Sequence, residues 1–325
     1  MKRFLLLLAL VPALFSCGKE KGALPGVVIP DPDPETGTET PAEPWGEAGM
    51  TGATYICNGE VQVGIDLGRG GGICHFSEKG TRRNLLNRYD TGRFVQQSYY
   101  GDADGSDWNG TAWNWNPVQG GSWKGVPSEI VSKEIGESSL KVVTRPRHWA
   151  TGELLADCEM TEEITLAGPC AKIVFSFKYT GSRSYKARHQ EMPAVFTDAA
   201  LGTLVCYTGS KPWTGDAVKR ITPKNLSDGA TNQYLTRTEE WSAYVDENDW
   251  GIGVYTPGTQ QVTYYSFGHG ATGAGASPCS YFSPIRTLAV TAGLNLRYEV
   301  WLTAGKSAAI RQTFADIRAG KTPGK

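Results

Sequence analysis

The chain has 325 residues, of which 40% are hydrophobic and 20% are charged, and it contains 40 glycines. Its 32 basic and 33 acidic residues nearly cancel, and no long basic stripe occurs, so the sequence predicts no nucleic-acid partner. The 10 Trp, 14 Tyr and 10 Phe residues exclude a chain that is disordered throughout, because disordered chains are poor in aromatic residues.

The first residues have the pattern of an export signal. A charged start precedes an apolar run over residues 4–15, which is too short to span a bilayer of ~30 Å. Residues 1–16 are therefore predicted to be a signal peptide. The string Leu14-Phe15-Ser16-Cys17 is similar to the lipobox of bacterial lipoproteins. This resemblance implies a lipid on Cys17 that anchors the protein to a bacterial membrane of the cell envelope, with the outer membrane expected. An ordinary secreted protein with a chance cysteine is the alternative.

Residues 17–50 are predicted to be the lipidated cysteine and a spacer. Between residues 18 and 50 the chain carries six prolines, and seven acidic residues against two lysines. Such a stretch cannot bury an apolar core, and it behaves as a stiff, solvated linker. One folded domain is expected to follow at residues 51–325.

The folded domain is predicted to be all-β. Apolar and polar residues alternate in several segments, at residues 61–65, 160–166, 172–179 and 296–302. A period of two is typical of half-buried strands. Only the last element has a helical pattern, in which Ile310, Phe314 and Ile317 share one face and Ser307 is the expected N-cap. We expect a large two-sheet antiparallel β-sandwich with a short C-terminal helix.

The six cysteines that follow Cys17 lack the spacing of a zinc site, and the sequence predicts no metal and no cofactor. A turn at residues 167–169 would set Cys170 opposite Leu166 and not opposite Cys158, so this pair is poorly placed for a disulfide. Other disulfides and buried free thiols both stay open. The acidic run 102–107 does not fit an EF-hand loop. Counted from Asp102, the sixth and twelfth positions, which need glycine and glutamate, are Asp107 and Trp113. The run is expected to be a solvated turn, with an irregular calcium loop as the alternative.

Two motifs resemble a known fold family. The first is the segment 292–305, which reads AGLNLRYEVWLTAG, together with Ile310-Arg311 after it. It resembles the closing strand and short helix of galactose-mutarotase-like β-supersandwich proteins. The Asp-x-Gly-Arg motif that ends at Arg93 resembles the Gly-Arg that brings a substrate-binding arginine to their sugar cleft. The resemblance implies a carbohydrate-active domain over about residues 55–320, with Arg93 in its cleft.

Tryptophans gather in one segment rich in Asn, Gly and Pro, at Trp108, Trp113, Trp115 and Trp123, and Trp213 lies in a second such segment. Exposed indoles call for a covering partner, and the apolar faces of sugar rings stack well on them. We expect Trp113, Trp115 and Trp213 to bind a glycan substrate. The alternative is that this loop folds back and its indoles close the core.

Two glutamates are the predicted catalytic carboxylates. Glu191 lies beside an apolar stretch and follows His189, and Glu240 precedes a tryptophan at the start of a predicted strand. Apolar surroundings raise the pKa of a carboxyl, as a general acid requires, and glycoside hydrolysis uses two carboxylates that flank the sugar. Glu191 and Glu240 are therefore assigned as the acid and the base or nucleophile, with His189 as a further catalytic candidate.

Four more residues are predicted to contact the substrate in a polar, aromatic-walled cleft: Arg93, Gln97, Tyr99 and Tyr100. A glycoside hydrolase is the first interpretation. A polysaccharide lyase would use Tyr99 or Tyr100 as the base. His189 and Arg93 would then neutralise a uronate. An aldose epimerase would use His189 as the acid but lacks a clear base, since Glu299 lies inside the last predicted strand. A non-catalytic glycan-binding lipoprotein would need only the tryptophans.

Overall fold

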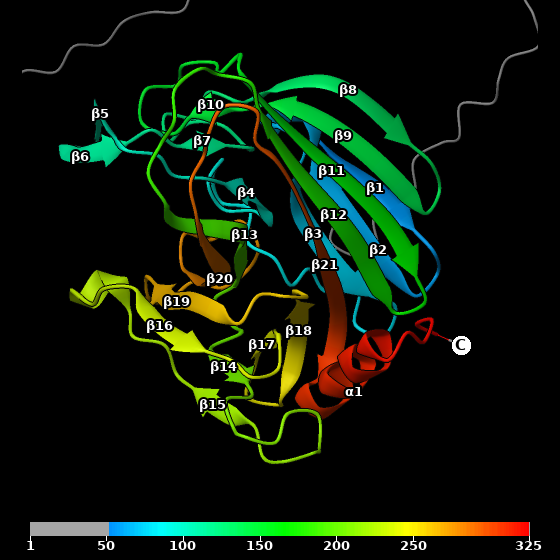
Figure 1. Cartoon of the computed structure of the whole chain (residues 1–325). Helices are drawn as coiled ribbons and strands as arrows, with labels where there is room; N and C mark the ends of the chain where they lie inside the picture. Colours follow the sequence, from blue (N-terminus) through cyan, green and yellow to red (C-terminus); the bar gives the residue numbers. More distant parts are fainter. Residues whose placement is uncertain (1–51, 325) are drawn as a thin grey trace, which may run out of the picture. The chain divides into compact units, whose positions relative to one another are not determined.

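The computed structural model describes residues 52–324, and their strands pair in antiparallel fashion. The largest sheet has nine strands, in the order β15 (Lys219–Ile221), β14 (Thr203–Cys206), β17 (Trp241–Val245), β18 (Trp250–Tyr255), β21 (Asn295–Lys306), β12 (Cys170–Tyr179), β11 (Cys158–Ala167), β9 (Ser139–Arg145) and β8 (Glu129–Ile135) (Figure 1). No helix in the described part of the chain is long and apolar enough to cross a membrane.

The second layer is built from two sheets. The seven-stranded sheet has the order β10 (Arg147–His148), β7 (Pro117–Val118), β4 (Gln96–Ser98), β13 (Arg188–Asp198), β20 (Cys279–Leu288), β19 (Gln261–Phe267) and β16 (Gln233–Thr236). The three-stranded sheet consists of β1 (Ala53–Cys57), β2 (Val61–Asp66) and β3 (Gly72–Glu78). A bridge between Ile73 and Val95 joins this sheet to the segment that leads into β4.

The remaining elements are short. A two-stranded hairpin, β5 (Ala103–Trp108) and β6 (Thr111–Asn114), projects from the layers (Figure 1). Two 3-10 turns lie at Leu67–Arg69 (η1) and Leu226–Asp228 (η2), and α1 (Ser307–Arg318) packs on the nine-stranded sheet. The expected all-β sandwich with a C-terminal helix is confirmed.

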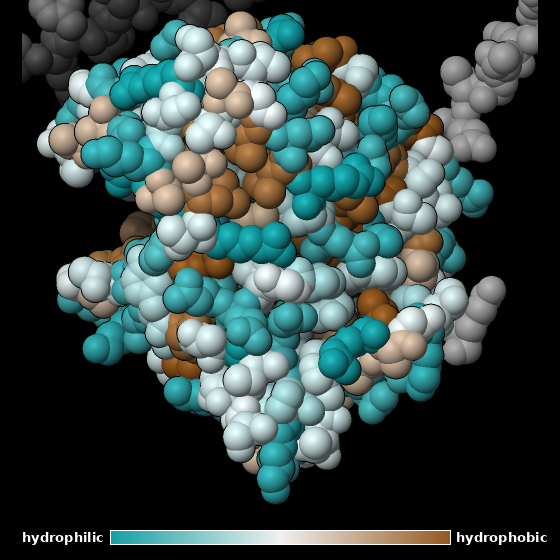
Figure 2. Space-filling model, viewed as in Figure 1, coloured by the Kyte–Doolittle hydropathy of each residue, from teal (hydrophilic) through white to brown (hydrophobic). Residues whose placement is uncertain are grey.

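The core fills the space between the layers because the strands alternate as their sequences predict. Along β11 the residues Met160, Ile164 and Leu166 are buried, and along β12 so are Ile173 and Phe175. Tyr99 and Phe177, from opposite layers, stack with their ring centroids 4.2 Å apart. On the face of the molecule seen in Figure 2, hydrophobic residues form only small, separate patches.

The C-terminal helix differs from its prediction by one residue. Lys306 is the extended residue before the helix, and Ser307 is the first residue of its first turn. The Ser307 hydroxyl donates to the Asp249 carboxylate at 2.9 Å instead of capping the helix. The helix lies close to β18 because Gly253 has no side chain there, and a Cβ atom at that position would stand 2.2 Å from Ile310 Cγ2.

The cysteines in residues 52–324 are all free, and five of the six are buried. In the hairpin of β11 and β12, Cys170 pairs with Ala167 and Cys158 pairs with Tyr179 at the other end. The sequence placed Cys170 opposite Leu166, one residue away from the observed register. The prediction that Cys158 and Cys170 are poorly placed for a disulfide is confirmed. Cys17 lies outside the described residues.

One carboxyl group is buried between the layers. Glu162 on β11 is fully buried, and Gln119 Nε2 donates to its Oε2 at 3.1 Å. Its Oε1 has no hydrogen bond within the described residues. Burial raises the pKa of Glu162 to about 8, because removing the carboxylate from water disfavours the charged form.

Glu162 should make stability depend on pH. Below its ordinary pKa of 4.5 the carboxyl group is protonated in both the folded and the unfolded chain, so its titration does not lower the free energy of unfolding. As the pH rises from there to about 8, the unfolded chain loses this proton first, and the free energy of unfolding falls by up to about 1.4 kcal/mol per pH unit. Glu162→Gln should abolish this loss in denaturant unfolding across that window. Glu159→Gln, at an exposed position of the same strand, should keep it, and an unchanged slope in Glu162→Gln would contradict the assignment.

Candidate active site

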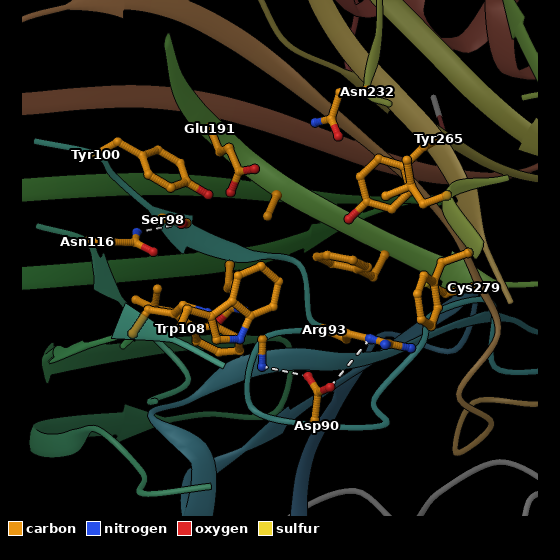
Figure 3. Close-up of a pocket in the computed structure, with 18 of the residues that line it drawn as sticks. Asp90, Arg93, Ser98, Tyr100, Trp108, Asn116, Glu191, Asn232, Tyr265 and Cys279 are labelled. Carbon is orange, nitrogen blue, oxygen red and sulfur yellow. Dashed lines mark hydrogen bonds and ion pairs between the residues drawn. The ribbon is translucent and has the colours of Figure 1, made fainter. Parts of the chain in front are cut away.

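A cavity of about 390 Å³ opens on the face of the seven-stranded sheet that is turned away from the core (Figure 3). β4 and β19 direct alternate residues into it, because successive side chains of a strand point to opposite faces, and β13 and β20 contribute further lining residues. The residues lining the cavity are Asp90, Gly92, Arg93, Gln96, Ser98, Tyr100, Trp108, Trp113, Asn116, Val118, Trp149, Glu191, Ala194, Phe196, Leu226, Asn232, Tyr265, Phe267 and Cys279.

Glu191 on β13 faces a group of tyrosines. The Tyr281 hydroxyl donates to Glu191 Oε1, and Tyr281 stacks on Tyr265 with ring centroids 4.3 Å apart. Burial raises the pKa of Glu191 above its usual value, partly offset by hydrogen bonds from Tyr281, Ser98 and Tyr100. The pKa values of Tyr100 and Tyr281 are also raised, first by burial and then by the neighbouring Glu191 carboxylate. Burial likewise raises the pKa of Tyr265, with smaller contributions from Cys279 and Glu191. Glu191 is therefore suited to hold a proton at a pH where an exposed glutamate would lose it.

The direction of Glu191 depends on a break in the β13 ladder. The pairing of β13 with β20 shifts between Glu191 and Val195, where Pro193 has no N–H to donate. An extra residue in one strand changes which side chains share a face. Glu191, Ala194 and Phe196 therefore all line the cavity, whereas Met192 and Val195 belong to the core.

Arg93 is fixed on the other side of the cavity. Its Nε lies 3.5 Å from Asp90 Oδ2, and its Nη1 donates to the Ser277 carbonyl oxygen. The guanidinium carbon lies 4.8 Å from the centroid of Phe267 and 5.1 Å from that of Tyr89. These contacts hold the guanidinium in one orientation, with Asp90 beside it as a second carboxylate at the cavity surface (Figure 3).

Three indoles form an aromatic wall, which we define as Trp108, Trp113 and Trp149. The Trp108 ring centroid lies 4.8 Å from that of Trp113 and 6.2 Å from that of Trp149, both in edge-on arrangements. Trp113 Nε1 donates to Asn116 Oδ1 at 3.2 Å. Gly92 lets the chain pass close to Trp149, since a Cβ atom there would stand 2.6 Å from its ring. The aromatic wall thus joins three segments: the hairpin that carries Trp108 and Trp113, the loop of Trp149 and the loop of Gly92.

The hairpin of β5 and β6 carries two of these indoles. Its turn residues Asn109 and Gly110 have φ of 50° and 83°, the conformation of the tight two-residue turns that join twisted strands. His148 Nδ1 accepts from the Ala150 amide at 3.1 Å, so His148 Nε2 carries the proton that it donates to Asp104 Oδ2 at 2.8 Å. This bond ties the hairpin to the loop that carries Trp149. The prediction of a solvated turn at residues 102–107 is therefore wrong in its local structure, because residues 103–107 belong to the largely exposed strand β5.

Breaking the bond between Asp104 and His148 should loosen the aromatic wall. Asp104→Ala is expected to speed amide hydrogen exchange across residues 103–114 and to shift the tryptophan fluorescence, without a change in overall fold by circular dichroism. Glu153→Ala removes an exposed carboxylate from the segment that follows Trp149 but leaves the bond to His148 in place, and it should leave the fluorescence unchanged. Equal behaviour of the two variants would show that Asp104 does not hold the wall.

Four of the residues predicted from the sequence line one cavity: Arg93, Tyr100, Trp113 and Glu191. Three others lie on the core side of the same strands and loops. Gln97 accepts from the Tyr99 hydroxyl and donates to the Thr161 carbonyl, Tyr99 stacks on Phe177, and Trp115 stacks on Tyr185. They support the cavity from behind and have no surface within it.

The other predicted site residues lie away from the cavity lining. Glu240 precedes β17 in the nine-stranded sheet, and His189 is exposed on β13 with its ring 5.9 Å from that of Tyr234. Trp213 lines a second hollow of about 360 Å³ beside α1, which it shares with Arg311. The buried glutamate of that region is Glu239, which Arg311 and Trp241 hold by hydrogen bonds.

The sequence analysis missed several residues that line the cavity, among them Asp90, Trp149, Tyr265 and Phe267, and it missed Tyr281, which donates to Glu191. Asp90 stands in the Asp-x-Gly-Arg motif, which offered a signal. The others come from strands and loops that are distant in sequence, and no local pattern distinguishes them from core aromatics. Among the described residues no three His, Cys, Asp or Glu side chains are grouped to hold a metal ion.

The fold is similar to those of solved sugar-active proteins. A galactose mutarotase-like protein from Lactobacillus casei matches with a TM-score of 0.50 at 14% identity, over 78% of this chain and 100% of that one. A galactose mutarotase related enzyme from Lactobacillus acidophilus gives a TM-score of 0.48 at 11% identity, over 78% and 97% of the two chains. A 4-alpha-glucanotransferase from Thermococcus litoralis gives 0.44 at 11% identity, over 77% and 37%.

The chain thus has a galactose-mutarotase-like all-β fold. No protein-family model matches the sequence, and no curated protein is significantly similar to it. At such low identities the likeness defines the fold, and the reaction has to be argued from the cavity.

Proposed function

We propose that this protein is a carbohydrate-active enzyme that cleaves a glycosidic bond in the cavity, with Glu191 as the general acid. The observation that carries the proposal is the position of Glu191, whose pKa is raised by burial, in a cavity that also contains the aromatic wall. Indole faces suit the C–H face of a sugar ring, and a carboxyl that stays protonated can give its proton to the leaving oxygen.

Asp90 is the second carboxylate of the proposed reaction. It lines the same cavity, and its Oδ2 lies 3.5 Å from Arg93 Nε. Two carboxyl groups in contrasting environments are the usual means of placing an acid and a base at one bond. Glu191 protonates the leaving oxygen, and Asp90 accepts a proton from the water that attacks the sugar carbon.

Aldose epimerisation is a second candidate, favoured by the likeness to the galactose mutarotase-like protein from Lactobacillus casei. Opening a sugar ring also needs a proton at the ring oxygen, which Glu191 could supply. The base would have to be a residue of the cavity. Glu299 does not line the cavity and forms an ion pair with Lys172 at 2.7 Å. An assay that follows both new reducing ends and anomer exchange separates the two reactions.

Replacing Glu191 tests the proposal. On a panel of plant and host glycans, Glu191→Gln should lower kcat by a factor on the order of 10² to 10⁴, because the amide has no proton to give. Binding of the glycan should be preserved. The wild-type rate should fall as the pH rises through the raised pKa of Glu191, since only the protonated acid is active.

Glu240→Gln is the comparison variant, because the sequence assigned Glu240 the second catalytic role and the structure leaves it out of the cavity lining. Loss of activity in Glu191→Gln alone supports the cavity mechanism, and loss in both supports the pair predicted from sequence. Full turnover by Glu191→Gln would refute the acid role. Unsaturated uronate products, seen by their ultraviolet absorbance, would point to a lyase.

Export and anchoring form a separate proposal that rests on the sequence. We propose that Cys17 is lipidated and holds the enzyme on a membrane of the bacterial envelope. The test expresses the protein in a bacterial host that is fed a labelled fatty acid. The wild-type chain should carry the label and sediment with membranes, and Cys17→Ala should lose both properties. Cys57→Ala, a cysteine of the folded domain, should retain both. Membrane association of an unlabelled wild-type chain would contradict this prediction.

A further inference from the structure

Exposed aromatic side chains gather around the mouth of the cavity. Within residues 52–324, the large hydrophobic side chains that are strongly exposed are Tyr89, Trp108, Val126, Val131 and Tyr234. Single exposed side chains of this kind are common on protein surfaces. The three aromatic ones, however, lie close to the cavity: Trp108 lines it, Tyr89 packs on the lining residue Arg93, and Tyr234 follows the lining residue Asn232 by two positions. A clustered exposure of this kind marks an interaction site.

Trp108 forms one side of the mouth. It lines the cavity, yet 37% of its surface is exposed, so its ring continues the aromatic wall out to solvent. Its neighbour Trp113 is partly buried behind it, with ring centroids 4.8 Å apart. A sugar bound beyond the cavity could therefore rest on Trp108 without displacing any side chain.

Tyr234 and His189 extend the surface on the β16 side of the mouth. Tyr234 is 58% exposed, and its ring centroid lies 5.9 Å from that of His189. His189 precedes Glu191 by two residues on β13 and so shares its face of the sheet. Asn232, two residues before Tyr234, lines the cavity (Figure 3). The surface of Tyr234 and His189 is thus continuous with the floor that carries Glu191.

Tyr89 adds a third exposed ring beside the cavity. One of its faces meets the Arg93 guanidinium at 5.1 Å, and 49% of the residue is exposed. Trp108, Tyr234 and Tyr89 come from three separate segments and carry no fixed charge. Flat, uncharged rings next to the amide of Asn232 and the imidazole of His189 suit a neutral carbohydrate, whose rings offer apolar faces and hydroxyl groups.

We infer that the cavity holds one sugar of an oligosaccharide and that neighbouring sugars of the same chain rest on Trp108 and on the pair Tyr234 and His189. This inference builds on the proposed function and narrows its substrate to a glycan longer than a single sugar. His189 is then a residue of an outer subsite, and the exposed rings determine how affinity depends on chain length.

Chain-length series test the inference. Binding of β-1,4-linked xylose, glucose, mannose and galactose series, from the monosaccharide to the hexasaccharide, would be measured by calorimetry on the full chain. The Glu191→Gln background keeps the ligands intact. Each sugar that gains an aromatic partner is expected to raise the affinity by a factor on the order of ten.

The variants locate the outer subsites. Tyr234→Ala and Trp108→Ala should each flatten the increase in affinity with length, and Tyr234→Ala should leave monosaccharide binding unchanged. Tyr234→Phe should retain the increase, because the ring remains. Val131→Ala is the matched control, since Val131 is an exposed hydrophobic residue on β8 in the other layer.

Three results would overturn the inference: affinity that does not change with length, an increase that survives both alanine variants, or no binding of any series. The proposed function can fail independently. If the wild-type chain binds longer oligosaccharides more tightly and releases no reducing ends, the subsites stand and the cleavage reaction is refuted.

Discussion

Successive residues of a strand point to opposite faces, and the seven-stranded sheet uses one face for the core and the other for the cavity. Along the chain, Tyr99 stacks on Phe177 in the core while Ser98 and Tyr100 face the cavity. Gln119 follows the cavity residue Val118. Its side chain donates to the buried Glu162 and accepts from the backbone N–H of Gln97. The packing of the two layers therefore also sets the positions of the cavity residues, and a change in the core reaches the site through one strand.

The electrostatics of the cavity follow from two different kinds of partner. Glu191 meets tyrosine hydroxyls, which are neutral donors, so burial dominates and raises the pKa of its carboxyl group. Asp90 meets a guanidinium that Phe267 and the Ser277 carbonyl already hold in place. The two acids thus differ because their surroundings differ, although both are short side chains in the same cavity. A ligand between them would meet a carboxyl group surrounded by hydroxyl donors on one side and a fixed ion pair on the other.

Local patterns were enough for the fold but only partly for the site. At residues 160–166 and 172–179, apolar and polar residues alternate because one face of each strand lies in the core, so the sequence predicts these strands. Residues 96–100, which read QQSYY, have no such contrast, so nothing in them tells that Tyr100 faces the cavity and Gln97 and Tyr99 the core. Trp113 and Trp115 are ambiguous in the same way. Tyr265 and Tyr281 reach Glu191 only through the pairing of β19, β20 and β13, which is a property of the whole sheet.

The described fold is held without any covalent link between its strands. Cys74, Cys206 and Cys279 are buried, and burial raises the pKa of each thiol to about 11 or 12. Only a thiolate attacks a disulfide or an oxidant, and at neutral pH these groups are almost entirely protonated and shielded. The pairing of the described strands therefore does not depend on a disulfide that a reductant could break.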